Sequence, residues 1–304
     1  MMMKGCRRQL DSLISAEEFA QNILKVNRGR VSVARSIMKA EFTVAFLEPH
    51  PTDTHKEYRE PEYRDDDRRN ALHKKIMDEL ITLPRLEHDD RIKLGKGGAK
   101  PAIEKNDAQA YIVMGSPASG KSGIAERLAD ENGAYILDSD YAKRKFPEYR
   151  HYEGGASLVH READKIIFNS ENSLFVHCVY NRCNMVIPLV GRTVSSVEDI
   201  CLKLMEAQYR IHIIDVALDR YQCVYRAYQR YQKTNRYVPL SYVFDEVGNE
   251  PERIYFLIKR AYAGHDSFVS FSQLSTDVPK GEPPEILECS AGSPIHFWST
   301  EQAE

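Results

Sequence analysis

The octapeptide GSPASGKS constrains the fold of this chain more than any other stretch. It runs from Gly115 to Ser122, directly after the apolar run YIVM, and it matches the phosphate-loop pattern GxxxxGK[ST]. Glycine lets the backbone approach a phosphate closely, successive N–H groups point into one concavity, and a following helix directs its N-terminus at the negative charge. We therefore predict a strand, a phosphate-binding loop and a helix in that order.

The loop predicts which residues would hold a nucleoside triphosphate. The Lys121 ammonium would reach the β- and γ-phosphates, and the Ser122 hydroxyl would bind Mg²⁺. The predicted nucleotide-binding residues are Gly115, Ser116, Pro117, Ala118, Ser119, Gly120, Lys121, Ser122 and Gly123. The loop leaves the reaction open, since GTPases, ATPases and small-molecule kinases share it. There is no guanine-reading NKxD motif, and the run ending at Asp215, which imitates a Walker B strand, is interpreted as a buried strand.

Composition and charge exclude several classes of protein. The 304 residues carry a formal net charge of −3, so there is no basic field that would favour nucleic acid. No apolar run approaches the ~20 residues of a membrane helix, and the N-terminal MMMKGCRRQL lacks the apolar core of a secretory signal. The six cysteines form no CxxC pair, which favours a reduced setting. We expect a cytoplasmic protein without a nucleic-acid or membrane partner.

The first hundred residues predict a helical extension. Residues 1–45 have a helical pattern with Ser15 as a candidate N-cap, residues 48–67 look like a charged surface connection, and residues 91–107 look like a mobile linker. A further helix is expected over residues 65–81. Its predicted buried stripe is Leu72, Ile76, Leu80 and, less regularly spaced, Met77.

From residue 108 onward, apolar runs alternate with helical stretches. This alternation predicts an α/β fold, a doubly wound and mostly parallel sheet with helices on both faces. The expected strands are 110–114, 134–138, 184–190, 211–218 and 267–274. The tail segments 285–290 and 294–299 are expected to pair as a hairpin. The predicted domains are residues 1–105, a helical extension and linker; 106–280, the α/β domain; and 281–304, the tail.

Two carboxylates follow the second expected strand, in the stretch YILDSDYAKRKFPEY from Tyr135 to Tyr149. Ligands of open α/β sheets bind at the carboxyl ends of the strands, and residues two apart on a strand point the same way. Asp138 and Asp140 are therefore expected to face a ligand together. One would support the metal ion, and the other would accept a proton from an attacking hydroxyl.

The loop followed by ILDSDYAKRKFPEY is similar to the zeta-toxin family of P-loop kinases. The similarity continues through VHREADKI, NMVIPLVGRT and RAYQRYQKTNRYVP, from about Arg69 to Ser275. It implies the P-loop kinase fold and the use of ATP and Mg²⁺. By the family's motif Asp140 is the base that deprotonates a sugar hydroxyl, while Asp138 could support the Mg²⁺ on Ser122 through water.

The resemblance also assigns the Tyr/Arg-rich helix to a lid over the phosphates. Arg226 and Arg236 match arginines that contact the γ-phosphate, and Arg230 is expected to point to solvent. The predicted catalytic set is Asp140, Lys121, Arg226 and Arg236. An amphipathic surface helix or an RNA-binding helix would show the same interleaving of Tyr and Arg, but the acidic chain disfavours RNA.

The chain departs from the family after the third expected strand. The founding members phosphorylate the 3′-hydroxyl of the amino sugar in UDP-N-acetylglucosamine and carry a Glu-Gly-Thr segment there. In its place stand Pro188, Leu189 and Val190, while Arg192 is retained. Because polar sugar-binding side chains are missing, NAD becomes the favoured acceptor, as for a type III effector of the wider family that phosphorylates the adenosine ribose of NAD. Arg192, Val190, Asp138 and Lys143 are the predicted substrate-binding residues.

The sequence thus predicts an ATP-dependent kinase of a nucleotide-type metabolite, acting as a toxin or as an effector delivered into a host cytosol. The alternatives are a UDP-N-acetylglucosamine kinase, a non-catalytic ATP-binding module and a polynucleotide 5′-kinase, which would need a basic groove. A protein partner would be an antitoxin or a chaperone. His160 and Glu162 are interpreted as structural, and His177 and Cys178 as residues of a buried strand.

Overall fold

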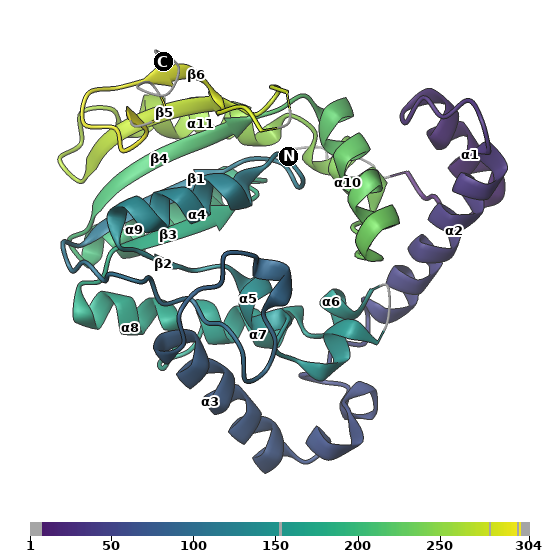
Figure 1. The fold of residues 1–304 in the computed structure, drawn as a ribbon, viewed down its shortest axis with the longest axis horizontal. Coiled ribbons are helices and arrows are strands. Elements are labelled where there is room, and N and C mark those ends of the chain that lie inside the picture. Colours follow the sequence, from purple (N-terminus) through teal and green to yellow (C-terminus); the bar gives the residue numbers. More distant parts are fainter. Residues whose placement is uncertain (1–7, 152–153, 280, 297, 299–304) are drawn as a thin grey trace. The chain divides into compact units, whose positions relative to one another are not determined.

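The computed structural model describes residues 8–151, 154–279, 281–296 and 298 (Figure 1). The chain forms two compact units, each built from three separate stretches. The helical unit comprises Met1–Lys100, Asp138–Val176 and Val224–Glu246. The sheet unit comprises Pro101–Leu137, His177–Cys223 and Val247–Glu304.

The sheet unit contains a single six-stranded sheet in the order β2-β3-β1-β4-β5-β6. All neighbours are parallel except β5 and β6. The central strand β1 is buried from Ala110 to Met114, as expected for a parallel strand covered on both faces. The strands are β1 (Gln109–Met114), β2 (Tyr135–Ile136), β3 (Met185–Leu189), β4 (Arg210–Ala217), β5 (Phe268–Ser275) and β6 (Glu285–Cys289). The predicted α/β fold with a mostly parallel sheet is confirmed.

Helices cover both faces of this sheet (Figure 1). They are α4 (Lys121–Asn132), α9 (Val194–Glu206) and α11 (Glu250–Tyr262). Parallel crossovers are right-handed, and the step from β1 to β2 runs along the sheet in the opposite direction to the step from β3 to β4. Helix α4 therefore lies on one face, and α9 and α11 pack against each other on the other. Trp298 is buried, with the Arg127 guanidinium of α4 5.4 Å from its ring centroid, so its side chain lies against α4.

The helical unit is made of helices and loops without a strand among its described residues. Its first two helices, the N-terminal helix pair, pack against each other. The elements of this unit are α1 (Leu13–Asn22), α2 (Arg30–Leu47), η1 (Lys56–Tyr58), η2 (Pro61–Tyr63), α3 (Asp66–Thr82), η3 (Asp89–Arg91), α5 (Ser139–Lys143), η4 (Pro147–Arg150), α6 (Gly155–Leu158) and α7 (His160–Ile167). Three elements begin in one unit and end in the other: α8 (Leu174–Asn181), α10 (Arg220–Thr234) and the π-helical turn η5 (Tyr242–Val247).

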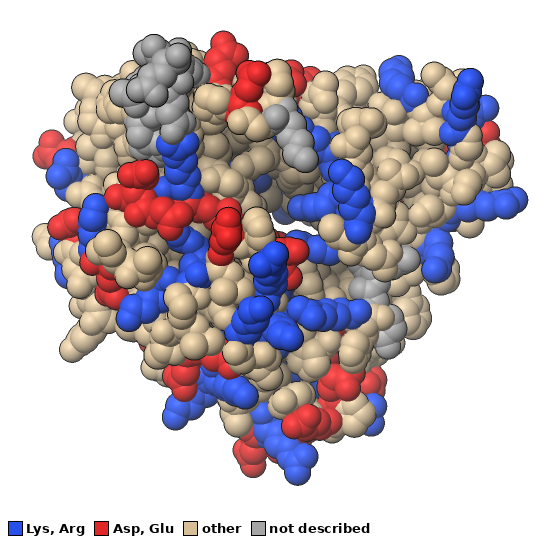
Figure 2. Space-filling view, in the orientation of Figure 1, with Lys and Arg blue, Asp and Glu red and all other residues tan. Residues whose placement is uncertain are grey.

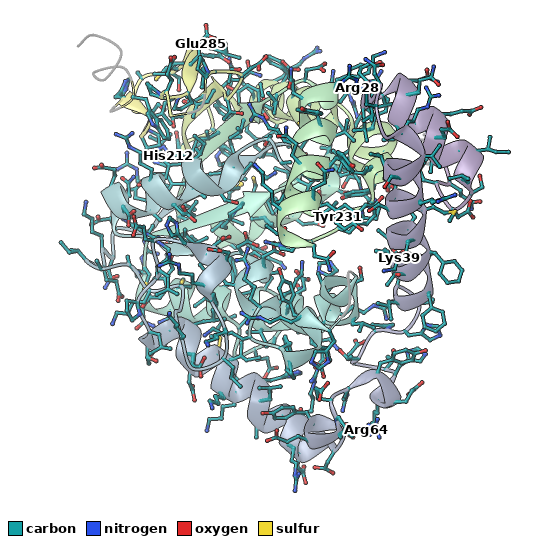
Figure 3. The ribbon with its side chains drawn as sticks, turned by 45° about the vertical axis from the view of Figure 1, so that its right-hand side comes forward. Arg28, Lys39, Arg64, His212, Tyr231 and Glu285 are labelled. Atoms are coloured by element: carbon teal, nitrogen blue, oxygen red, sulfur yellow. The ribbon has the colours of Figure 1, made fainter. Side chains whose placement is uncertain are left out.

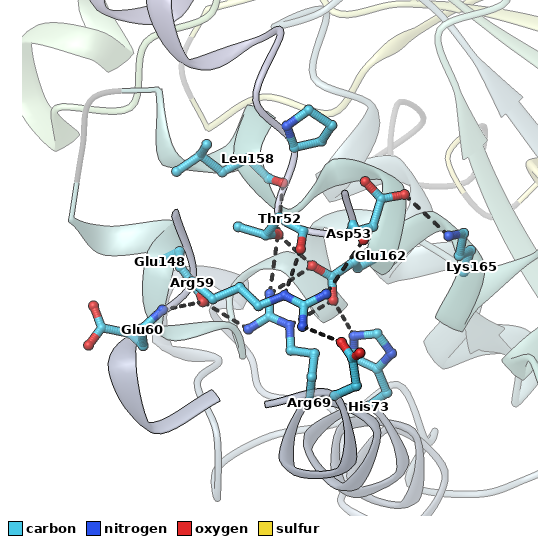
Figure 4. A network of polar contacts seen from close by, with 12 residues as sticks. Thr52, Asp53, Arg59, Glu60, Arg69, His73, Glu148, Leu158, Glu162 and Lys165 are labelled. Atoms are coloured by element: carbon cyan, nitrogen blue, oxygen red, sulfur yellow. Dashed lines mark hydrogen bonds and ion pairs between the residues drawn. The ribbon is translucent and has the colours of Figure 1, made fainter. Parts of the chain in front are cut away.

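A buried ionic network holds α3, η4 and α7 together (Figure 4). Arg69 of α3 is 1% exposed, and its guanidinium donates to Glu148 at 2.8 Å and to both carboxylate oxygens of Glu162 at 2.7 and 2.8 Å. Glu162 also accepts from the Thr52 hydroxyl at 2.5 Å and contacts His73. Burial acts to raise the pKa of Glu162, but hydrogen bonds from His73 and Arg69 outweigh it and hold that pKa well below its usual range.

Several local expectations about the N-terminal hundred residues need correction. The described part of the expected first helix is two helices, separated by residues 23–29, and the N-cap is Ser12 rather than Ser15. The charged connection is partly internal, since Thr52 and Arg59 are buried. The expected linker is packed as well, with Ile92 and Ala99 fully buried. Residues 1–7 of the expected helix lie outside the described part of the chain.

Two expectations near the middle and end of the chain are also wrong. His177 and Cys178 lie on helix α8, not on a strand. Strand β6 pairs antiparallel with β5 and not with residues 294–299, of which 297 and 299 lie outside the described part. By contrast, α3 and its buried Leu72, Ile76 and Leu80 agree with the sequence pattern.

Candidate active site

The phosphate loop has the backbone shape that its two glycines predict. Gly115 has φ 152°, and a Cβ there would lie 2.7 Å from the Ser119 hydroxyl and 2.8 Å from the Val216 carbonyl oxygen. Gly120 has φ 93° and precedes α4 as its N-cap. The Thr276 hydroxyl, after β5, donates to the Ser119 carbonyl at 2.6 Å and fixes the loop from a second strand. Only glycine fits the first position without moving the surrounding backbone.

The polar groups of the loop fit an anionic ligand. The Lys121 ammonium donates to the carbonyl oxygens of Gly115 and Ser116 at 2.6 and 2.7 Å, so it curls over the loop. The Ser119 hydroxyl is buried and finds no hydrogen-bond partner among the described residues. Ser122 and Gly123 are exposed in the first turn of α4, where a helix dipole favours negative charge. This donor set can receive phosphate oxygens.

A cavity of about 260 Å³ adjoins the start of the loop within the sheet unit. Its walls come from Ser116, the carboxyl ends of β4 and β5, and the first turn of α11. Asp215, in register with Met114, lies at this wall and is fully buried. Gln273 donates to one oxygen of its carboxylate at 2.9 Å, while the other oxygen has no partner among the described residues.

Burial raises the pKa of Asp215 to about 7. The sequence interpretation of this run as a buried strand is confirmed by β4, but it overlooked a half-paired carboxyl beside the phosphate loop. The signal was present, because a charged residue at the end of an otherwise apolar strand is costly unless it has a partner. Gln273 and Thr276, which support Asp215 and the loop, carried no motif.

Asp138 and Asp140 belong to the helical unit, and their geometry differs from the prediction. Strand β2 ends at Ile136, so the two residues do not share a strand face. Asp138 is the N-cap of α5 and accepts from the Asp140 N–H at 2.8 Å, while Asp140 lies in the first turn of that helix. The short strand gives way to a helix because an Asx cap at Asp138 satisfies a free N–H of the first turn.

Asp140 is held between two cations. One carboxylate oxygen accepts from Lys143 at 2.9 Å and the other from Arg236 at 2.8 Å. Burial acts to raise the pKa of Asp140, but the charges of Lys143 and Arg236 outweigh it and hold that pKa well below its usual range. Burial and the neighbouring Asp140 charge instead raise the pKa of Asp138. The pKa values of the two carboxyls are therefore shifted in opposite directions, and Asp140 is the ionised one.

Further arginines surround this carboxylate. Arg144 is buried and pairs with Asp89 at 2.7 Å, and the Arg236 guanidinium lies 5.7 Å from the Tyr149 ring centroid. Arg230 is half-buried, contrary to the expectation that it points to solvent. Its Nε, one Arg144 nitrogen and the Tyr149 hydroxyl are buried without a partner among the described residues. Unpaired donors of this kind suit an anionic group.

The structure also gives the positions of the other predicted site residues on α10 and after β3. Arg226 is half-buried on α10, one turn before Arg230. Val190 and Arg192 follow β3, whose last residues pair with Val113 and Met114, so they lie at the same sheet edge as the phosphate loop. Gly191 between them has φ 66°, and a Cβ there would meet the Met114 side chain at 2.7 Å. The structure thus brings Asp140, Lys143 and Arg236 together within the helical unit, and Val190 and Arg192 to the edge that carries Lys121.

The described residues contain neither a metal cluster nor a membrane-spanning helix. Among them, no cluster of three or more His, Cys, Asp or Glu side chains is placed to hold a metal ion. No helix combines the length and apolarity needed to cross a membrane. Over the face shown in Figure 2, Lys and Arg side chains are interspersed with Asp and Glu. A Mg²⁺ ion bound mainly by nucleotide phosphates and water does not need a protein cage.

A mostly parallel sheet with this phosphate loop after its central strand β1 defines the fold of P-loop nucleotide-binding proteins. The family model described as Zeta toxin matches residues 96–269, more than half of the chain. The chain belongs to this family, whose members are small-molecule kinases that use ATP, and it is therefore a zeta-toxin-like kinase.

Other comparisons are weaker. Among solved structures, the chain is similar to one from a study of the PezAT chromosomal toxin–antitoxin system of the human pathogen Streptococcus pneumoniae. The identity is 14% and the TM-score 0.47, over 74% of this chain and 81% of that chain. A similarity at this level does not define a function. None of the curated proteins compared with the chain matches it.

Proposed function

We propose that the protein transfers the γ-phosphoryl group of ATP to a ribose or sugar hydroxyl of a nucleotide-type metabolite. The observation that carries this proposal is the Asp140 carboxylate, which is kept ionised between Lys143 and Arg236. A carboxylate acting on a hydroxyl beside cations that can meet a phosphoryl group is the arrangement that such a transfer requires. A module that only senses ATP would need no such carboxylate.

In this mechanism the phosphate loop holds ATP, and Lys121 exchanges the carbonyls of Gly115 and Ser116 for phosphate oxygens. Mg²⁺, held by Ser122 with Asp138 supporting it through water, would neutralise phosphate charge. Asp140 accepts the hydrogen bond of the acceptor hydroxyl and orients its oxygen. The new O–P bond forms as the bond from the γ-phosphorus to its bridging oxygen breaks. The hydroxyl proton passes to Asp140, and ADP leaves.

The low pKa of Asp140 is consistent with this role. A phosphoryl-transfer transition state is loose, so the hydroxyl needs orientation more than early deprotonation. Arg236 and Arg226 would stabilise the charge on the phosphoryl oxygens. Arg236 would exchange part of its contact with Asp140 for those oxygens, which would also bring the pKa of Asp140 closer to its usual value.

Among acceptors we favour NAD, phosphorylated at the 3′-hydroxyl of its adenosine ribose. Pro188 and Val190 replace the polar side chains that hold the nucleotide sugar in the founding members of the family. A buried polar group left unpaired costs ~1–3 kcal/mol, so two such losses would weaken the nucleotide sugar by about 10²-fold or more. Arg192 is exposed and can still bind a pyrophosphate, which both acceptors contain.

The second candidate is UDP-N-acetylglucosamine, the acceptor of the founding members, because Arg192 and Asp140 are retained. With either acceptor, consumption of an essential metabolite would make the protein a toxin or an effector, acting in a cytosol. An antitoxin or a chaperone would then be its protein partner.

The test is incubation of the full chain with γ-labelled ATP, Mg²⁺ and a panel of NAD, NADP, UDP-N-acetylglucosamine, nucleosides and RNA. We expect label in a product of NAD. Label only in UDP-N-acetylglucosamine would show that NAD is the wrong acceptor and would leave the proposed kinase activity unchanged. Label in RNA, or in no acceptor at all, would contradict the proposal.

A further inference from the structure

The segment that carries Arg236 is fastened to the N-terminal helix pair within the helical unit. The lid segment, residues 224–246, contains most of α10, a loop and most of η5. In that loop Tyr237, 6% exposed, donates its hydroxyl to the Glu41 carboxylate of α2 at 2.7 Å. Glu41 is itself 6% exposed, which is rare for a glutamate. A carboxylate this buried needs a hydrogen-bond partner, and the Tyr237 hydroxyl is one.

Contacts on either side of Tyr237 reinforce this attachment. Ser36 of α2 donates to the Tyr231 hydroxyl at 3.2 Å, and Figure 3 shows Tyr231 on the side of α10 toward α2. The Tyr231 and Tyr237 rings pack edge to face, with centroids 4.9 Å apart. At the other end, Arg8 forms a bidentate pair with Asp245 at 2.7 and 2.8 Å.

An aromatic contact completes the second attachment. The Phe19 ring of α1 meets the Phe244 ring edge to face, with centroids 6.1 Å apart, and the Arg8 guanidinium lies over both rings. The loop that carries Arg236 is therefore anchored before and after, and both anchors are N-terminal. Because neighbouring residues share a backbone, fixing Tyr237 limits where the Arg236 guanidinium can reach.

We propose that Glu41 is a positioning residue, which fixes Tyr237 and thereby holds Arg236 at Asp140. The inference rests on the proposed function and adds to it that the N-terminal helix pair is part of the catalytic apparatus. The chain of contacts runs from Glu41 to Tyr237, along one peptide unit to Arg236, and on to the Asp140 carboxylate at 2.8 Å. The opposite reading, in which these helices inhibit the kinase, predicts that loosening them raises the rate.

The distinction matters because misplacing a catalytic group by about 1 Å can cost ~10²-fold in rate. Arg236 belongs to a loop whose preceding residue, Asn235, has φ 58°, so its own backbone does not fix it in a regular helix. The buried hydrogen bond to Glu41 supplies that constraint. The phosphate loop holds ATP, whereas Arg236 acts on the charge that develops on the phosphoryl oxygens in the transition state, so the affinity for ATP should be insensitive to this contact.

The test compares Glu41→Ala, Glu41→Gln, Tyr237→Phe and the control Phe42→Ala in the full chain. Phe42 neighbours Glu41 on α2 but is 67% exposed. Turnover is measured with the acceptor that wild-type protein phosphorylates, and KM for ATP is measured in the same assays. Glu41→Ala and Tyr237→Phe should lower kcat by ~10–10²-fold with KM for ATP unchanged. Glu41→Gln, which keeps an oxygen acceptor, should recover most of the loss, and Phe42→Ala should match wild type.

A second readout does not depend on turnover. Amide hydrogen exchange over residues 235–246 should quicken in Glu41→Ala and Tyr237→Phe but not in Phe42→Ala. Unchanged exchange, a raised kcat, or an equal fall of kcat in Glu41→Gln and Glu41→Ala would overturn the inference. Wild-type protein that phosphorylates no acceptor contradicts the proposed function, whereas normal wild-type turnover with full activity in Glu41→Ala contradicts only the positioning role.

Discussion

In the sheet unit the phosphate loop is shaped by backbone, whereas in the helical unit Asp140 is surrounded by side chains from distant stretches. Gly115 and Gly120 impose φ values that shape the loop within a single octapeptide. Asp140 instead meets Lys143 three residues away and Arg236 ninety-six residues away. A local backbone motif tolerates changes elsewhere, but a site assembled from long-range ion pairs depends on every element that frames it.

The largest effect is expected at the loop. Lys121→Ala should abolish phosphoryl transfer, because the ammonium is the point charge on the β- and γ-phosphates. The free energy of unfolding should change little, since Lys121 is only half-buried at the start of α4. Transfer and denaturant unfolding would be measured together. Glu131→Ala, an exposed change at the far end of the same helix, is the control, and turnover of Lys121→Ala near the wild-type rate would remove the loop from the mechanism.

Asp140→Asn should lower kcat by about 10²–10⁴-fold, the range for a lost general base, with little change in ATP affinity. Asp138→Asn is the comparison variant: asparagine can also cap α5, and the proposed support of Mg²⁺ through water is indirect, so kcat should fall less than in Asp140→Asn. Steady-state kinetics with equilibrium ATP binding separates the two steps. If Asp138→Asn proves the more damaging change and Asp140→Asn is silent, the base has been assigned to the wrong carboxylate.

The long-range character of the helical unit is tested by Arg69→Ala. This change leaves Glu148 and Glu162 buried without their cation and should lower the free energy of unfolding by about 3–5 kcal/mol. Arg68→Ala, exposed one residue earlier, should change it by about 0.5 kcal/mol or less. Denaturant unfolding measures both. Equal, small effects would mean that the network does not hold this unit together.

The smallest expected effect concerns Asp215 and depends on pH. Its folded pKa of about 7 exceeds the unfolded value of ~3.9, so its contribution to stability is complete below pH 4 and is lost as pH rises through 7. Asp215→Asn replaces the carboxyl with an amide that does not titrate, and so removes this pH-dependent loss of stability. Relative to wild type, the free energy of unfolding of the variant should therefore rise by about 2–3 kcal/mol between pH 5 and pH 8. Asp277→Asn, exposed at the same cavity, should show no such rise.

The same contrast explains what the sequence could predict. The order of the first five strands, and the phosphate loop with a helix after it, follow from local pattern and agree with the structure. The geometry around Asp140 does not follow from local pattern. The expectation of two carboxylates on one strand was wrong because β2 ends at Ile136 and Asp138 caps a helix instead.

Long-range pairs left no periodic signal. Glu41 with Tyr237 and Arg69 with Glu162 join residues 196 and 93 positions apart, and each partner alone looks like an ordinary polar surface residue. Only the family resemblance points to Arg236, and no local pattern in the sequence links it to Asp140. Asp215 was the exception, a buried charge whose cost could have been recognised from its apolar neighbours.

The most direct test of the central claim is the fate of the γ-phosphoryl group in a single reaction. Wild-type protein and Asp140→Asn would each be incubated with γ-labelled ATP, Mg²⁺ and NAD, and the label divided by mass spectrometry and chromatography between an organic phosphate ester and inorganic phosphate. The account predicts that wild type forms the ester on the adenosine ribose and that Asp140→Asn binds ATP but forms very little. Label recovered only as inorganic phosphate, at the same rate in both proteins and with every acceptor of the panel, would contradict it.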